Sequence, residues 1–130
     1  MYRKIEVQFW TDPKIKAIGG AARYLMLYLI TNPHTHVSGI YYLPKAFVAH
    51  ETGIELSELD TLYDTLSGAG LAKFSPDTDD VVWVVNMFRH QGPGPKLYRS
   101  AAKHLDTLHR CSLTEAFCLA YPEVQEYRDG

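Results

Sequence analysis

Apolar side chains gather in short runs along this chain, and the longest run covers residues 21–31. Its polar groups are few, chiefly the guanidinium of Arg23 and two tyrosine hydroxyls. An element that is apolar around nearly its whole circumference is typical of a helix buried on most sides. Proline disfavours helical geometry in the residue before it, so the helix ends at Asn32-Pro33. We expect it to be the central helix of the core, preceded by a short helix over residues 13–18.

Two histidines, His34 and His36, stand between this helix and the next apolar run, residues 40–43. They could supply two metal ligands, but a structural zinc site needs four ligands and a catalytic one usually three. No nearby Cys, Asp or Glu completes such a spacing. The β-branched and aromatic residues of 40–43 favour a short strand. We therefore interpret the stretch as a helix-to-strand connector that turns at Gly39, and expect no metal site.

The following pattern predicts two short helices joined by a glycine turn. Pro44 suits the first position of the first helix, and Gly53 suits its C-terminal cap. Ser57 and Asp60 have the spacing of a capping box at the start of the second helix. The apolar residues of that second helix recur at helical spacing: Leu59, Leu62, Tyr63 and Leu66. Two helices joined in this way form a helix-turn-helix unit.

Two strand-like runs, residues 71–74 and 81–85, surround a turn cluster at residues 76–80. The order helix, strand, helix-turn-helix and hairpin describes a winged helix. The predicted fold class is therefore α+β, mainly α: a winged helix-turn-helix with a short β-hairpin wing and a C-terminal helical extension.

Glycine and proline alternate at residues 92–95 and predict a boundary. After it, apolar residues occupy one side of a helix that starts near residue 96, and basic residues occupy the other. A second capping box, Ser112 with Glu115, precedes a last helix that we expect Pro122 to end. We thus divide the chain into a winged-helix domain, residues 1–91, and a Gly/Pro linker with a helical extension that packs on it, residues 92–130.

The composition limits the class of protein. A chain of 130 residues with 46% hydrophobic composition can bury one core. No run approaches the roughly 20 apolar residues of a membrane span, and the N-terminus lacks the apolar segment of a secretory signal, so we expect a cytoplasmic protein. Cys111 and Cys118 lie seven positions apart in a helical stretch, beyond the reach of a disulfide, and we expect both to be reduced.

The formal net charge of −2 conceals a separation of charge along the chain. Residues 54–80 contain seven acidic side chains and one lysine, Lys73. Residues 88–110 contain five basic side chains and one acid, Asp106. We expect two faces of opposite sign.

Three stretches together resemble a known family: YLMLYLITNPHTHVSGIYYLP, AHETGIE and VVWVVNMFRHQ. They look like the N-terminal winged-helix domain of the DnaD-like replication proteins of phages and bacteria, the replisome organisers. The resemblance covers roughly residues 5–91. Its more specific parts are TNPHT-x-x-SGIY and the aromatic strand in VVWVVNMFRHQ, which is followed by basic residues and a glutamine. It implies a role in DNA replication, because members assist initiation by binding DNA or organising replisome proteins, often with self-association through this domain.

The basic residues are the candidates for contact with nucleic-acid phosphates, which Lys and Arg bind with little base specificity. Tyr98, between two of them, offers a surface on which a base could stack. An ordinary solvated helix face is the alternative, with Asp106 paired to Lys103 or Arg110. The full candidate set is Lys45, Arg89, His90, Lys96, Tyr98, Arg99, Lys103 and Arg110.

The helix over residues 57–66 would be the DNA-reading helix of a winged helix, yet its exposed side is acidic. Carboxylates there, and at Asp77, Asp79 and Asp80 of the wing tip, would repel phosphates. We therefore assign its exposed side to a protein interface. The candidates are Glu58, Thr61, Asp64 and Thr65.

No pattern predicts catalysis. Cys111 with His104 or His109 lacks the orienting third group that a catalytic cysteine needs, and Asp77-x-Asp79-Asp80 lacks the glycine and distal glutamate of a calcium loop. No phosphate-binding or dinucleotide-binding glycine loop is present. We expect a non-enzymatic phage-type replication accessory or initiation protein without cofactors, which binds DNA or replisome proteins. The alternatives are a protein–protein or oligomerisation module without DNA binding, and a phage transcription regulator.

Overall fold

A small antiparallel sheet lies at the centre of the computed structural model, which describes residues 2–76 and 80–129. The strand order is β1-β3-β2, so β3 pairs with both neighbours. Ile40 of β1 and Lys73 of β2 both lie opposite Trp83 of β3. The strands are β1 (Ile40–Tyr42), β2 (Ala72–Phe74) and β3 (Val81–Val84).

All four residues of β3 are buried, because both faces of the sheet are covered. Val82 and Val84 belong to one hydrophobic cluster, whereas Val81 and Trp83 belong to a second. This arrangement explains why the sequence of β3 is a continuous apolar run rather than an alternating one.

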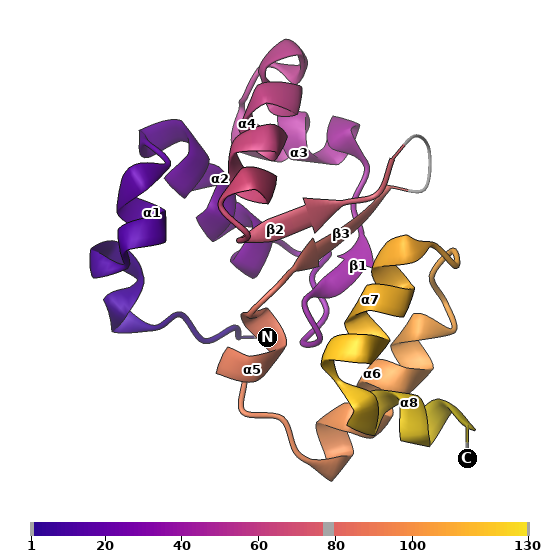
Figure 1. Ribbon diagram of the computed structural model, residues 1–130. Coiled ribbons are helices and arrows are strands. Elements are labelled where there is room, and N and C mark those ends of the chain that lie inside the picture. Colours follow the sequence, from indigo (N-terminus) through magenta and orange to yellow (C-terminus); the bar gives the residue numbers. More distant parts are fainter. Residues whose placement is uncertain (1, 77–79, 130) are drawn as a thin grey trace.

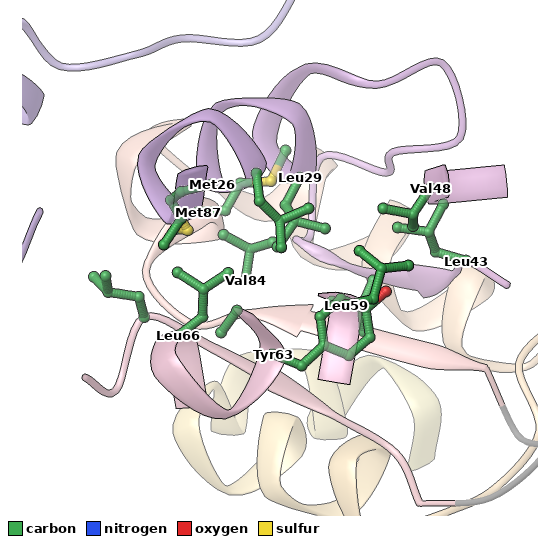
Figure 2. Close-up of a cluster of buried hydrophobic side chains, with 14 of the residues drawn as sticks. Met26, Leu29, Leu43, Val48, Leu59, Tyr63, Leu66, Val84 and Met87 are labelled. Carbon is green, nitrogen blue, oxygen red and sulfur yellow. The ribbon is translucent and has the colours of Figure 1, made fainter. Parts of the chain in front are cut away.

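Three helices enclose the first cluster: α2 (Gly20–Thr31), α3 (Lys45–Thr52) and α4 (Leu56–Gly68). Figure 2 shows Met26 and Leu29 of α2 and Leu59 and Leu66 of α4 gathered around Val84. The predicted central helix is confirmed, since α2 contributes several fully buried side chains and ends at Asn32. Gly53 caps α3 with φ 78°, as predicted.

The second cluster is enclosed by the C-terminal helices, which lie across the sheet from α3 and α4 (Figure 1). Phe117 of α7 meets the edge of Trp83 at a centroid distance of 6.0 Å. Phe88 and Tyr121 complete a group of aromatic rings around Phe117. These helices are α5 (Met87–His90), α6 (Pro95–Leu105), α7 (Ser112–Ala120) and α8 (Pro122–Asp129).

The N-terminal residues form a short 3-10 helix, η1 (Val7–Thr11), followed by α1 (Pro13–Ala17). The side chain of Asp12 accepts from the backbone N–H of Lys14 at 2.8 Å and caps α1, as its sequence predicts. The buried side-chain amide of Gln91 accepts from the backbone N–H of Lys4 and donates to its carbonyl, both at 3.1 Å. This pair of hydrogen bonds attaches the N-terminal segment to α5.

Gly39 is the turn between the histidine stretch and β1. It has φ 82°, and a Cβ there would lie 2.9 Å from both the Val84 carbonyl oxygen and Met87 Cβ. Only glycine fits this position without displacement of its neighbours. The expected connector is therefore present.

The predicted fold class is confirmed at the level of a mainly helical α+β protein with one small antiparallel sheet. Three predicted helix starts are shifted by one or two residues. α3 starts at Lys45, and Pro44 is its cap residue rather than its first helical position. α4 starts at Leu56 after the cap residue Glu55, so Ser57 lies inside the helix. α7 starts at Ser112, and its capping contacts join Cys111 and Thr114. α7 ends at Ala120, before Pro122, as predicted. It is not the last helix, however, because Pro122 also begins α8, and proline suits a first helical position.

Candidate nucleic-acid interface

Three cationic side chains form a line along the exposed side of α6, which we call the α6 basic stripe: Lys96, Arg99 and Lys103. Their spacing of three and four residues places them on one face of the helix. Ala101, Ala102 and Leu105 are buried on the opposite face. The predicted amphipathic helix with a basic outer side is therefore confirmed as far as Leu105, but Arg110, predicted on the same side, lies beyond its end.

The cations of the stripe form no salt bridges. Within residues 2–76 and 80–129, no salt bridge reaches any of its three side chains. Asp106, which the alternative interpretation paired with Lys103 or Arg110, instead lies 3.7 Å from the guanidinium of Arg128 on α8. That predicted pairing is wrong, and the stripe keeps its charge.

Tyr127 of α8 lies beside the stripe. The guanidinium carbon of Arg99 is 5.4 Å from the centroid of the Tyr127 ring, and 37% of Tyr127 is exposed. α6 packs along α8, which brings these residues together. Sequence reasoning missed Tyr127 because it ended the helix at Pro122, although proline at a first helical position was the available signal.

Tyr98, the predicted stacking residue, faces inward. Its ring meets the edge of the buried Phe88 ring at 5.9 Å. Partial burial and the hydrogen-bonded carboxylate of Glu123 raise the pKa of Tyr98. Tyr98 therefore packs in the protein rather than presenting a free ring on the stripe.

The other basic candidates lie on separate elements. Arg89 and His90 are exposed on α5, and His90 Nδ1 is 3.7 Å from the Glu6 carboxylate. Arg110 is exposed in the connection between α6 and α7. Lys45 is on α3, where it forms a salt bridge with Asp60 of α4. The structure thus places Lys45 with the acidic residues, on the side of the sheet away from α6.

The exposed side of α4 is acidic, as the sequence predicts. Glu58, Thr61 and Asp64 are exposed, and the hydroxyl of Thr65 donates to the Thr61 carbonyl at 3.0 Å. Between α4 and the hairpin is a hollow of about 420 Å³ lined by Asp60, Asp64 and Asp80, among other residues. Burial, with Asp80 and Asp60 nearby, raises the pKa of Tyr63 in this hollow to about 12. Asp77 and Asp79 of the predicted wing tip lie outside the described residues.

The two histidines of the connector have protein partners. His34 Nε2 lies 2.7 Å from the Glu51 carboxylate. His36 Nδ1 lies 2.9 Å from Ser38 Oγ, and the ring of His36 stacks on that of His104. His104 Nε2 lies 2.8 Å from the carbonyl oxygen of Ile40. No group of three or more candidate metal ligands occurs among the residues that the structure describes.

The cysteines are free thiols, as predicted: Cys118 is buried and Cys111 partly buried. His104, one of the bases considered for Cys111, is instead held between His36 and the Ile40 carbonyl. No helix within residues 2–76 and 80–129 is long and apolar enough to cross a bilayer.

Comparison with known proteins adds no assignment. No family model matches the chain, and no curated protein or solved structure matches it either.

Proposed function

We propose that this chain is a non-enzymatic winged-helix protein of phage-type DNA replication, and that it binds nucleic acid through the α6 basic stripe. The order of elements supports the winged-helix part: a helix and β1, then α3 and α4 as the helix-turn-helix, then the β2–β3 hairpin. The strand order β1-β3-β2 joins the hairpin to β1 in one sheet, which supports reading the hairpin as the wing. The resemblance of residues 5–91 to DnaD-like proteins supports the replication context.

One observation carries the choice of binding surface: three exposed cations without salt bridges form a row on α6, whereas the exposed side of α4 is acidic. In DNA-binding helix-turn-helix proteins the second helix enters the major groove and contacts bases and phosphates. Here that helix would bring Glu58 and Asp64 to the phosphates. Repulsion disfavours that docking, so we assign polyanion binding to the α6 basic stripe, on the opposite side of the sheet.

The composition of the stripe determines the kind of binding. Lysine and arginine contacts to phosphates fix position but carry no sequence information. We therefore expect weak, strongly salt-dependent binding with little base preference. If the three cations of the stripe each neutralise one phosphate, log affinity for duplex should fall with log salt at a slope of about −3.

Fluorescence anisotropy with labelled DNA, at low and rising salt, tests the proposal. The double variant Arg99→Glu, Lys103→Glu should abolish binding. Lys14→Glu, Lys16→Glu is the matched control, because it reverses two exposed lysines on α1 and changes the net charge equally. Equal loss of affinity in both variants would show a response to net charge alone, and no binding at low salt would refute the proposal.

The acidic side of α4 favours a second candidate function, a protein-interaction surface. Leu56, at the start of α4, is 56% exposed beside the acidic residues. A stable oligomer that dissociates on Asp64→Lys, measured by light scattering, would support it. A strict monomer at high concentration would exclude self-association through this face.

A further inference from the structure

The contact between Arg99 and Tyr127 distinguishes this basic helix from an ordinary charged surface. The guanidinium of Arg99 lies over the Tyr127 ring, and that ring remains 37% exposed. Cations and an accessible aromatic ring therefore occur together on the outer surface of α6 and α8.

Carboxylates of α8 also lie on this side of the molecule. Asp106 pairs with Arg128, and Asp129 accepts a hydrogen bond from the neutral side-chain amide of Gln125 at 2.8 Å. Glu123 and Glu126 belong to the same helix. Within the described residues, no salt bridge joins any of these carboxylates to the α6 basic stripe, so its three cations stay available to phosphates.

The α6 basic stripe is as long as a short segment of a nucleic-acid strand. Lys96 and Lys103 are seven residues apart in α6, which corresponds to about 10 Å along the axis at a rise of about 1.5 Å per residue. A row of cations of this length can follow several phosphates of one strand. An exposed ring at its side gives a base a surface on which to stack.

We propose that Lys96, Arg99, Lys103 and Tyr127 form a binding site for single-stranded nucleic acid, in which Tyr127 stacks on a base while the stripe binds the backbone. This inference rests on the proposed function. It adds a preference for single-stranded over double-stranded nucleic acid and assigns that preference to Tyr127. A single strand exposes the faces of its bases, whereas in a duplex those faces are covered by neighbouring base pairs. Phosphate contacts therefore serve both forms, and Tyr127 contributes to the single strand alone.

The test compares two substitutions at Tyr127. Tyr127→Leu keeps an apolar side chain beneath Arg99 but removes the aromatic face, and Tyr127→Phe keeps the face. The probes are labelled oligo-dT and oligo-U of about 16 nucleotides, the upper end of single-strand site sizes, and a duplex of the same length. We expect Tyr127→Leu to weaken oligo-dT and oligo-U binding about tenfold, to leave duplex binding unchanged, and Tyr127→Phe to bind as the unaltered protein does.

Other outcomes are distinguishable. Single-strand binding that is unchanged in Tyr127→Leu overturns the stacking role but leaves the stripe as a phosphate-binding surface. Absence of binding to every nucleic acid refutes the proposed function itself. Polyglutamate that competes as well as oligo-dT assigns the stripe to an acidic protein and overturns the inference.

A second measurement is independent of affinity. Ultraviolet cross-linking of the unaltered protein to oligo-dT, followed by mass spectrometry, should place an adduct on Tyr127. Adducts confined to other tyrosines, such as the exposed Tyr24 on α2, would contradict the inference.

Discussion

The imidazole rings of His36 and His104 lie parallel, 3.9 Å apart between centroids and inclined by only 1°. They join the stretch before β1 to α6, and therefore connect the two sides of the molecule. Burial, together with His104 and Arg3, lowers the pKa of His36 to about 4. Burial also lowers the pKa of His104, against the opposing effect of its hydrogen bond to the Ile40 carbonyl.

This pair predicts a loss of stability in mild acid. A histidine in the unfolded chain has a pKa of about 6.5. Below that pH the unfolded chain therefore binds more protons than the folded pair, whose pKa values are lower, and proton binding favours unfolding. Stability should be complete above about pH 6.5 and should fall as the pH decreases toward 4, by about 2 kcal/mol after allowance for solvent screening. Urea unfolding at pH 7 and pH 5 measures the change.

The matched variants for that experiment are His36→Gln and His50→Gln. His50 is exposed on α3, so its replacement should leave the pH dependence intact, whereas His36→Gln should flatten it. A pH dependence that is the same in all three proteins would show that the stacked pair does not control it.

Substitution by alanine should cost more stability at Gly39 than at Gly53. Gly39→Ala combines a left-handed backbone with a 2.9 Å approach to Val84 and Met87, and should cost about 3 kcal/mol of unfolding free energy. Gly53→Ala has the same backbone geometry with open space around it, and should cost about 1 kcal/mol. Chemical denaturation measures both, and equal losses would contradict the role of the close approach at Gly39.

The Gln91 amide predicts a local effect at the N-terminus. Gln91→Leu removes both hydrogen bonds to Lys4, and should release the N-terminal segment while α2 and the sheet stay folded. Limited trypsin digestion should then cleave faster after Arg3 or Lys4. Gln125→Leu, a change on α8 far from that segment in sequence, should leave the cleavage rate unchanged. Equal rates in the two variants would refute the attachment role.

The shared sheet predicts the behaviour of a shortened chain. Removal of residues 92–130 would expose Ile40, Val81 and Trp83, which the C-terminal helices now cover. We expect residues 1–91 alone to aggregate or to lose much of their stability, because large apolar side chains would face water. Size-exclusion chromatography and thermal unfolding test this. A stable monomer of residues 1–91 would show that these residues fold independently.

Local signals in the sequence predicted most of the elements, and non-local contacts account for the failures. Pro44 and Gly53 each act within one turn, so the bounds of α3 could be predicted closely. The apolar run of β3 predicted a strand, but neither its burial nor the elements that cover each face. Pro122 predicted the end of α7 but not the start of α8, because the same residue can follow one helix and begin another.

The candidate site was predictable in its charges and unpredictable in its partners. The spacing of Lys96, Arg99 and Lys103 is a property of one helix and was visible in the sequence. The contacts of Arg99 with Tyr127, and of His36 with His104, join residues 28 and 68 positions apart. No local periodicity encodes such contacts, so the inward position of Tyr98 and the pairing of Lys45 with Asp60 required the structure.

The sheet that separates α4 from α6 also limits the range over which the α6 basic stripe can act. Residues 92–130 contain five Lys or Arg and five Asp or Glu, so the formal charge of the C-terminal helices sums to zero. The three cations of the stripe therefore act through their position on α6 and not through a net charge of that side. Their attraction for a polyanion is confined to about one Debye length, roughly 8 Å at physiological salt, so close contact rather than long-range steering would bring the two together.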